Sequence, residues 1–129
     1  MKKIILSLIL LFSFSFGDST DYIKSLTNNI EKPILVLIKQ NNCRYCEKQI
    51  KVIDNSVLRE YIEKNFQFTT INRSNDMIPV ELLGSNVSPT IFVVTKKGII
   101  IDEMKGLQKT NTLLKRLNRS LYRVNKWNQ

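Results

Sequence analysis

The chain holds only two cysteines, and both lie in the stretch Cys43-Arg44-Tyr45-Cys46. Two thiols that are separated by two residues can bind a metal ion, staple the chain as a structural disulfide, or exchange electrons as a dithiol. These three uses make different demands on the surrounding residues, so the rest of the sequence helps to separate them.

The other residues support a metal site poorly. A structural zinc ion takes four Cys or His ligands, whereas this chain has two cysteines and no histidine. Two thiolates can hold copper(I), but small copper carriers commonly place a methionine two residues before the first cysteine, where this chain has Asn41. We therefore expect no metal and no other cofactor.

A structural disulfide is a further alternative. A Cys43–Cys46 bridge would close a loop of only four residues, for which the chain-entropy relation gives about 1.9 kcal/mol, against ~3 kcal/mol for a 15-residue loop. A lone structural bridge is expected to span more chain. A redox pair needs instead an exposed, easily ionised first thiol with a second thiol behind it.

The spacing of apolar residues after the pair favours this redox arrangement. Cys46, Ile50, Ile53 and Val57 follow one another at intervals of four, three and four residues, which is the buried stripe of a helix. Cys46 then points inward. Cys43 falls at or next to the helix N-cap, where unpaired N–H groups and the helix dipole stabilise an anion, so we expect it to be the nucleophile.

The N-terminus has the pattern of a secretory signal peptide over residues 1–17. Two lysines precede an apolar run that is shorter than the ~20 residues of a transmembrane helix. Ser15 and Gly17 are the small residues expected before cleavage at Asp18. We expect a cleaved, exported, periplasmic protein, with an uncleaved membrane anchor as the alternative.

Residues 18–129 are long enough for one domain. Two of the 20 basic residues lie in the leader, so 18 basic and 11 acidic residues remain, a formal charge of +7. The basic residues are not interleaved with aromatic or glycine motifs, and we expect no nucleic-acid partner.

The mature chain alternates between helical and strand patterns. The expected elements are a helix over residues 20–31 that ends before Pro33, a strand over 34–39, the Cys46 helix, a helix over 57–64, a strand over 66–72, a short helix over 77–83 capped by Asn75 or Asp76, strands over 91–95 and 98–104 joined by a turn, and a final helix from Thr110 to Val124.

The final helix is strongly basic, because seven basic residues and no acidic residue follow Glu103. Two interpretations fit this charge. It is either a solvated helix face or a docking surface for an acidic partner or a membrane, to which Tyr122 and Trp127 would add amphipathic contacts.

This order of elements resembles the thioredoxin superfamily over residues 18–121. The most specific parts are the apolar strand that ends shortly before Cys43 and the segment Val87-Ser88-Pro89-Thr90 that leads into a hairpin. The resemblance implies an α/β thioredoxin fold, in which a central mixed sheet is flanked by helices.

The resemblance also assigns roles to residues. Pro89 would be the cis-proline that lies against the cysteines, although only ~5% of X-Pro bonds in folded proteins are cis. The backbone of Ser88 would face Cys43 and, together with Pro89 and Thr90, would position an extended substrate segment. Arg44 and Tyr45 would modulate potential and recognition, and a solvated surface role fits Arg44 equally well.

The sequence departs from thioredoxin itself. Its dipeptide is Arg-Tyr in place of Gly-Pro, no tryptophan precedes Cys43, and Leu37 stands where thioredoxins bury an aspartate. Tyr45 is more similar to periplasmic disulfide reductases and isomerases of the Dsb type. The chain has no separate dimerisation domain, so we expect a monomer.

These features together predict an exported thiol:disulfide oxidoreductase that acts on protein disulfides through Cys43 and Cys46. The compartment favours a reductase that is supplied by a membrane electron donor or another redox partner protein. The alternative function is a non-catalytic thioredoxin-fold binding protein that keeps the Cys43–Cys46 disulfide as a structural element.

Overall fold

The apolar run that follows Pro33 forms an inner strand of the sheet. The computed structural model describes residues 32–79, 82 and 86–127. The elements are β1 (Ile34–Lys39), α2 (Arg44–Ile53), α3 (Ser56–Asn65), β2 (Gln67–Asn72), β3 (Thr90–Val94), β4 (Ile100–Lys105) and α4 (Thr110–Trp127).

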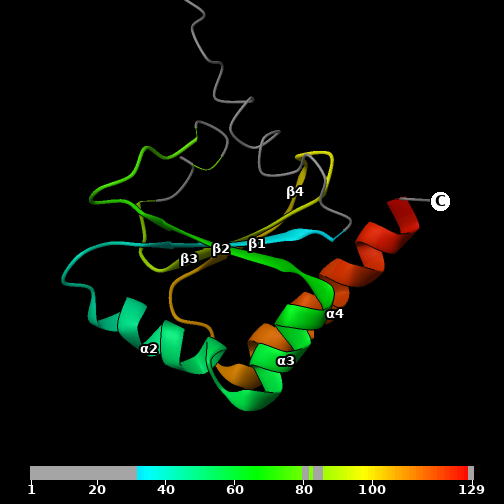
Figure 1. The fold of residues 1–129 in the computed structure, drawn as a ribbon, viewed down its shortest axis with the longest axis horizontal. Coiled ribbons are helices and arrows are strands. Elements are labelled where there is room, and N and C mark those ends of the chain that lie inside the picture. Colours follow the sequence, from blue (N-terminus) through cyan, green and yellow to red (C-terminus); the bar gives the residue numbers. More distant parts are fainter. Residues whose placement is uncertain (1–31, 80–81, 83–85, 128–129) are drawn as a thin grey trace, which may run out of the picture.

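The four strands form one mixed sheet in the order β2-β1-β3-β4 (Figure 1). β1 runs parallel to β2 and antiparallel to β3, and β3 runs antiparallel to β4. The predicted α/β class with a mixed sheet flanked by helices is therefore confirmed.

β1 is buried on both faces, as expected for a continuous apolar strand. Leu35 and Leu37 point to the face that α2, α3 and α4 cover, and Figure 1 shows these three helices on the same side of the sheet. Their neighbours in β1 point to the opposite face and pack against Phe92 and Leu82. The alternation follows from the two-residue period of a strand.

α3 and α4 pack side by side below the sheet. The hydroxyl of Tyr61 donates a hydrogen bond to Oδ1 of Asn118, which joins the two helices. Burial raises the pKa of Tyr61 above its ordinary value, so its phenol stays neutral at physiological pH.

Most of the predicted elements agree with the structure within two residues. The hairpin turn between β3 and β4 uses Gly98 at a φ of +83°, a conformation that glycine adopts without steric cost. The basic helix runs from Thr110, and Leu113, Leu117 and Val124 form its buried side. Among the described residues, none of the helices is both long and apolar enough to cross a bilayer.

Two predictions are wrong in the described residues. Val57 was expected on the buried stripe of the Cys46 helix, but it lies in α3, after α2 has ended at Ile53, and its side chain is 63% exposed.

A helix was expected over 77–83, but Met77, Ile78 and Pro79 are not helical. Leu82, the other described residue of this range, has a 3-10 helical conformation, and its N–H donates to the carbonyl of Pro79. Asp76 does not cap a helix there, because its carboxylate accepts a hydrogen bond from the backbone N–H of Asn72 and closes a turn after β2. The expected leader over residues 1–17 and the expected helix over 20–31 lie outside the described residues.

Candidate active site at the start of α2

The register of β1 and β3 brings the two predicted parts of the site to one end of the sheet. Ile38, near the end of β1, lies opposite Thr90, the first residue of β3. Because the strands are antiparallel, the loop that leaves β1 and the segment that leads into β3 emerge at the same end of the sheet. Cys43 follows the first of these strands, and Ser88 precedes the second.

The loop that carries Cys43 is held by the turn that follows β2. Asn41 receives a hydrogen bond from the side chain of Asn72, and its backbone N–H donates to the hydroxyl of Ser74. Asn42 has a φ of +54°, in the left-handed region where asparagine is common. These contacts fix how the chain turns from β1 into α2.

Cys43 is the N-cap of α2, as the helical spacing predicted. Its Sγ accepts a hydrogen bond of 3.1 Å from the backbone N–H of Cys46, and its carbonyl accepts one from the N–H of Glu47. An N–H donor and the positive end of the helix dipole both act on the same sulfur. This arrangement favours the thiolate of Cys43 once the pair is reduced.

Cys46 is buried, with only 2% of its surface exposed, while Cys43 is partly exposed. The two residues form a disulfide, and their Cα atoms are 5.2 Å apart. One turn of helix therefore places one sulfur at the surface and the other behind it. A reagent or a substrate can approach the Cys43 side only.

The segment before β3 lies against the disulfide. The carbonyl oxygen of Ser88 is 3.8 Å from Sγ of Cys43, and the Ser88–Pro89 peptide bond is cis. Pro89 is buried, and its carbonyl accepts a hydrogen bond from the N–H of Gly106. Thr90 is fully buried and donates its hydroxyl to the carbonyl of Val87, so its side chain shapes the segment from within.

The two residues between the cysteines are both exposed. Arg44 lies in solvent, where water and salt screen its charge. The ring of Tyr45 is 58% exposed, and Nζ of Lys48 lies 5.4 Å from its centre. Tyr45 therefore presents an aromatic surface beside the disulfide, with a cation over the ring.

Leu37 occupies a fully buried position in the core cluster beneath the helices. A leucine side chain cannot accept or release a proton. When the disulfide forms, the proton of Cys46 must therefore pass to water or to a group other than residue 37.

The structure adds one residue that the sequence analysis did not single out. Gln49 is fully buried in α2, and its amide makes two hydrogen bonds to the backbone of Gln108, one to the N–H and one to the carbonyl. The same loop holds Pro89 through the N–H of Gly106, whose φ is +80°. Gln49 therefore ties the cysteine helix to the proline segment through one short loop.

A signal for Gln49 was present in the sequence. It lies three residues after Cys46 and four before Ile53, which places it on the buried stripe of the helix. A polar residue on a buried stripe requires a partner, but the sequence does not indicate which one.

Metal-binding residues do not gather in the part of the chain that the structure describes. Within it, no group of three or more His, Cys, Asp or Glu side chains is arranged to hold an ion. The two sulfurs are bonded to each other in this state and offer no thiolate to a metal.

A mixed sheet, a cysteine pair at the head of a helix and a proline segment against that pair together define a thioredoxin-fold protein with a dithiol site. Residues 21–120 match the thioredoxin-like domain, and the chain belongs to that family. The family and the cysteine pair together support a protein-disulfide oxidoreductase.

A curated relative described as a disulfide bond formation protein, from Brevibacillus choshinensis, is 29% identical over 72 residues. The match covers 56% of this chain and 59% of the relative, so the chain spans well under two thirds of that protein's length.

Two solved structures share the fold. A thioredoxin from Thermus thermophilus has a TM-score of 0.66 at 16% identity, over 84% of this chain and 88% of that one. The oxidised C-terminal domain of DsbD from Neisseria meningitidis has a TM-score of 0.60 at 15% identity, over 78% and 90% of the two chains. At these identities the likeness shows the fold alone.

Replacing Gln49 by methionine should destabilise the protein. The apolar side chain fills a similar volume but leaves the N–H and carbonyl of Gln108 without their partner, so we expect the free energy of unfolding to fall by about 1–3 kcal/mol. Urea unfolding followed by circular dichroism measures the change. The matched control is Gln67→Met, at an exposed position of β2, which should change stability by less than about 0.5 kcal/mol. Equal losses in the two variants would contradict the proposed link.

Proposed function

We propose that this protein is an exported thiol:disulfide oxidoreductase that reduces disulfides in other proteins. The observation that carries the proposal is the asymmetry of the cysteine pair. Cys43 is partly exposed, and its sulfur receives a hydrogen bond from a backbone N–H and lies 3.8 Å from the Ser88 carbonyl oxygen, while Cys46 is buried one turn behind it. Thiol–disulfide exchange needs this division between an attacking and a resolving thiol.

In the first step, the thiolate of Cys43 attacks one sulfur of a substrate disulfide. A new bond forms between Cys43 and that sulfur, the substrate disulfide breaks, and the other substrate sulfur leaves as a thiolate. The N–H of Cys46 and the helix N-terminus stabilise the attacking anion beforehand.

In the second step, Cys46 loses its proton and attacks the sulfur of Cys43. The Cys43–Cys46 disulfide forms, the mixed disulfide breaks, and the substrate leaves with both of its sulfurs reduced. Two electrons have then passed from the protein to the substrate. The cysteine pair is oxidised in the structure, the form that this step would produce, and a dithiol donor would have to reduce it before the next cycle.

Ser88, Pro89 and Thr90 would place the substrate for the attack. A carbonyl at Ser88 that faces the reactive sulfur is a backbone group with which an extended segment can pair. Tyr45 and Val87 are both exposed and would offer apolar contact to residues that flank the substrate cysteine. Arg44 would act only through its charge, because it lies in solvent.

Export and the direction of electron flow are further parts of the proposal. The leader pattern over residues 1–17 supports export, and relatives described as a disulfide bond formation protein and as a domain of DsbD fit an exported location. An exported reductase needs a source of electrons, so we propose a membrane electron donor as its partner and disulfide-containing proteins as its substrates.

The purified protein should catalyse the reduction of insulin by dithiothreitol. Cys43→Ser should lower the rate to that of dithiothreitol alone, because no thiolate remains to attack. Cys46→Ala should still make the first attack and accumulate a mixed disulfide, visible on a non-reducing gel. Equal insulin turnover by the protein and Cys43→Ser would instead favour a binding protein with a structural disulfide.

The redox state of the pair in living cells tests the direction. A reductase that a donor keeps supplied should be recovered mainly with free thiols after rapid acid quenching and alkylation, which shifts its mobility on a gel. An oxidant would be recovered mainly as the disulfide. The double variant with Cys43→Ser and Cys46→Ser cannot be alkylated and serves as the mobility reference. A cysteine pair that is recovered almost wholly oxidised would contradict the reductase assignment.

The N-terminus of the protein isolated from its native cells tests export. Cleavage of the leader predicts that the mature chain begins at Asp18 and is recovered in the exported fraction. Mass spectrometry of the intact protein measures this directly. A chain that retains residues 1–17 in the membrane fraction would support the anchor alternative, and recovery from the cytosol would rule out export.

A further inference from the structure

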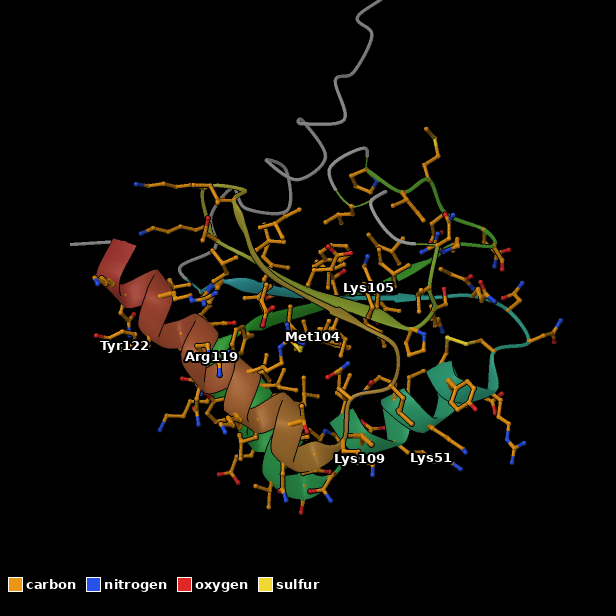
Figure 2. The ribbon with its side chains drawn as sticks, turned by 180° about the vertical axis from the view of Figure 1, so that it is seen from behind. Lys51, Met104, Lys105, Lys109, Arg119 and Tyr122 are labelled. Atoms are coloured by element: carbon orange, nitrogen blue, oxygen red, sulfur yellow. A yellow bond between two sulfur atoms is a disulfide. The ribbon has the colours of Figure 1, made fainter. Side chains whose placement is uncertain are left out.

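An open groove lies far from the cysteine pair, between the start of β4 and the C-terminal half of α4. Its apolar wall consists of Ile99, Ile100 and Ile101, and its volume is about 860 Å³. Residues of α4 form the facing wall, namely Arg119, Tyr122, Arg123 and Lys126. Figure 2 shows Arg119 and Tyr122 on this half of the helix.

Two arginines of α4 are already engaged with β4. Arg116 makes a paired contact with the carboxylate of Asp102, and Arg123 donates to the carbonyl of Ile101. These contacts hold the helix along the strand. They also give the groove a defined geometry, because both of its walls are fixed to each other.

The remaining cations of the groove face no counter-ion in the part of the chain that the structure describes. The side chains of Arg119 and Lys126 make neither an ion pair nor a hydrogen bond there, and the sequence of α4 contains no acidic residue. Lys96 and Lys97 are exposed in the turn that leads directly to Ile99. The groove thus combines an apolar wall with positive charges that no described acidic side chain pairs.

The shape and the charge favour a peptide over the other possible occupants. Ile99 and Tyr122 are exposed at the groove, whereas Ile100 and Ile101 are partly buried within it, where a flat bilayer surface does not reach them. A second copy of this chain would bring the same positive helix to the same surface, which is repulsive. A peptide with acidic residues beside one or two aliphatic side chains complements both features.

We infer that the groove between residues 99–101, at the start of β4, and residues 119–126 of α4 is a docking site for an acidic peptide segment of a partner protein. α2 begins at the opposite side of the molecule from the end of α4 (Figure 1). A partner held in the groove would therefore leave Cys43 open to substrate. The site would recruit the protein to a partner without occupying its dithiol.

Binding of a labelled peptide to the full chain tests the inference. The probe is a short fluorescein-labelled peptide rich in glutamate with a few leucines, and its comparator has lysine in place of every glutamate. The acidic probe alone should raise fluorescence anisotropy, and it should shift the ¹⁵N amide resonances of residues 99–101 and 119–126. Arg119→Glu combined with Lys126→Glu should weaken binding at least about tenfold.

The matched control is Lys51→Glu combined with Lys64→Glu, which makes the same change in net charge at exposed positions of α2 and α3. It should weaken binding less than about twofold. Reduction of insulin should be the same in both double variants, so failure of docking is separable from failure of the dithiol chemistry.

Three results would overturn the inference. The first is an equal loss of binding in both double variants, which would indicate bulk charge attraction. The second is an absence of peptide binding, or resonance shifts at sites outside the groove. The third is that the peptide does not bind but the protein co-sediments with vesicles of equal parts phosphatidylcholine and phosphatidylglycerol, and that this co-sedimentation depends on Arg119. That result would identify the groove as a membrane-binding surface.

Discussion

The antiparallel pairing of β1 with β3 is the constraint on which the site depends. Ile38 opposes Thr90, so the ends of these two inner strands coincide. A shift of the pairing by one residue would turn every apolar side chain of β1 to the opposite face. Both faces of β1 are buried in separate apolar clusters, so such a shift would exchange side chains between two closely packed clusters and disrupt the packing of both. The distance between Cys43 and Ser88 follows from the register that this packing selects.

Within that frame, the chemistry of the pair comes from its position in one helix. The N-cap residue has an extended backbone and lies outside the helix, whereas a residue three positions later lies on the inner face. Two identical side chains thereby acquire different exposure and different hydrogen bonding. This difference in exposure and hydrogen bonding requires no ionisable side chain at position 37, where the chain has a buried leucine.

Besides covering the core, α4 binds the backbone of β4, which is an edge strand of the sheet. Arg116 donates to the carbonyl of Glu103 and Arg123 to that of Ile101, so two backbone acceptors on this strand are paired with helix side chains. Such covering protects an edge strand from pairing with other chains. Arg119 and Lys126 of the same helix line the groove. The arginines that bind β4 are therefore different residues from the two cations that remain available to a partner.

The sequence by itself determined the features that depend on local spacing: the buried strand, the N-cap position of the first cysteine, the inward position of the second and the apolar stripe of α4. These depend on the periods of a helix and a strand, which neighbouring residues reveal. Only the tertiary structure decided which polar groups pair. Asp76 pairs with Asn72 instead of starting a helix, and Gln49 joins Gln108, a residue 59 positions away. A hydrogen-bonding side chain satisfies whichever donor or acceptor the fold brings near it, and periodicity contains no information about that distance.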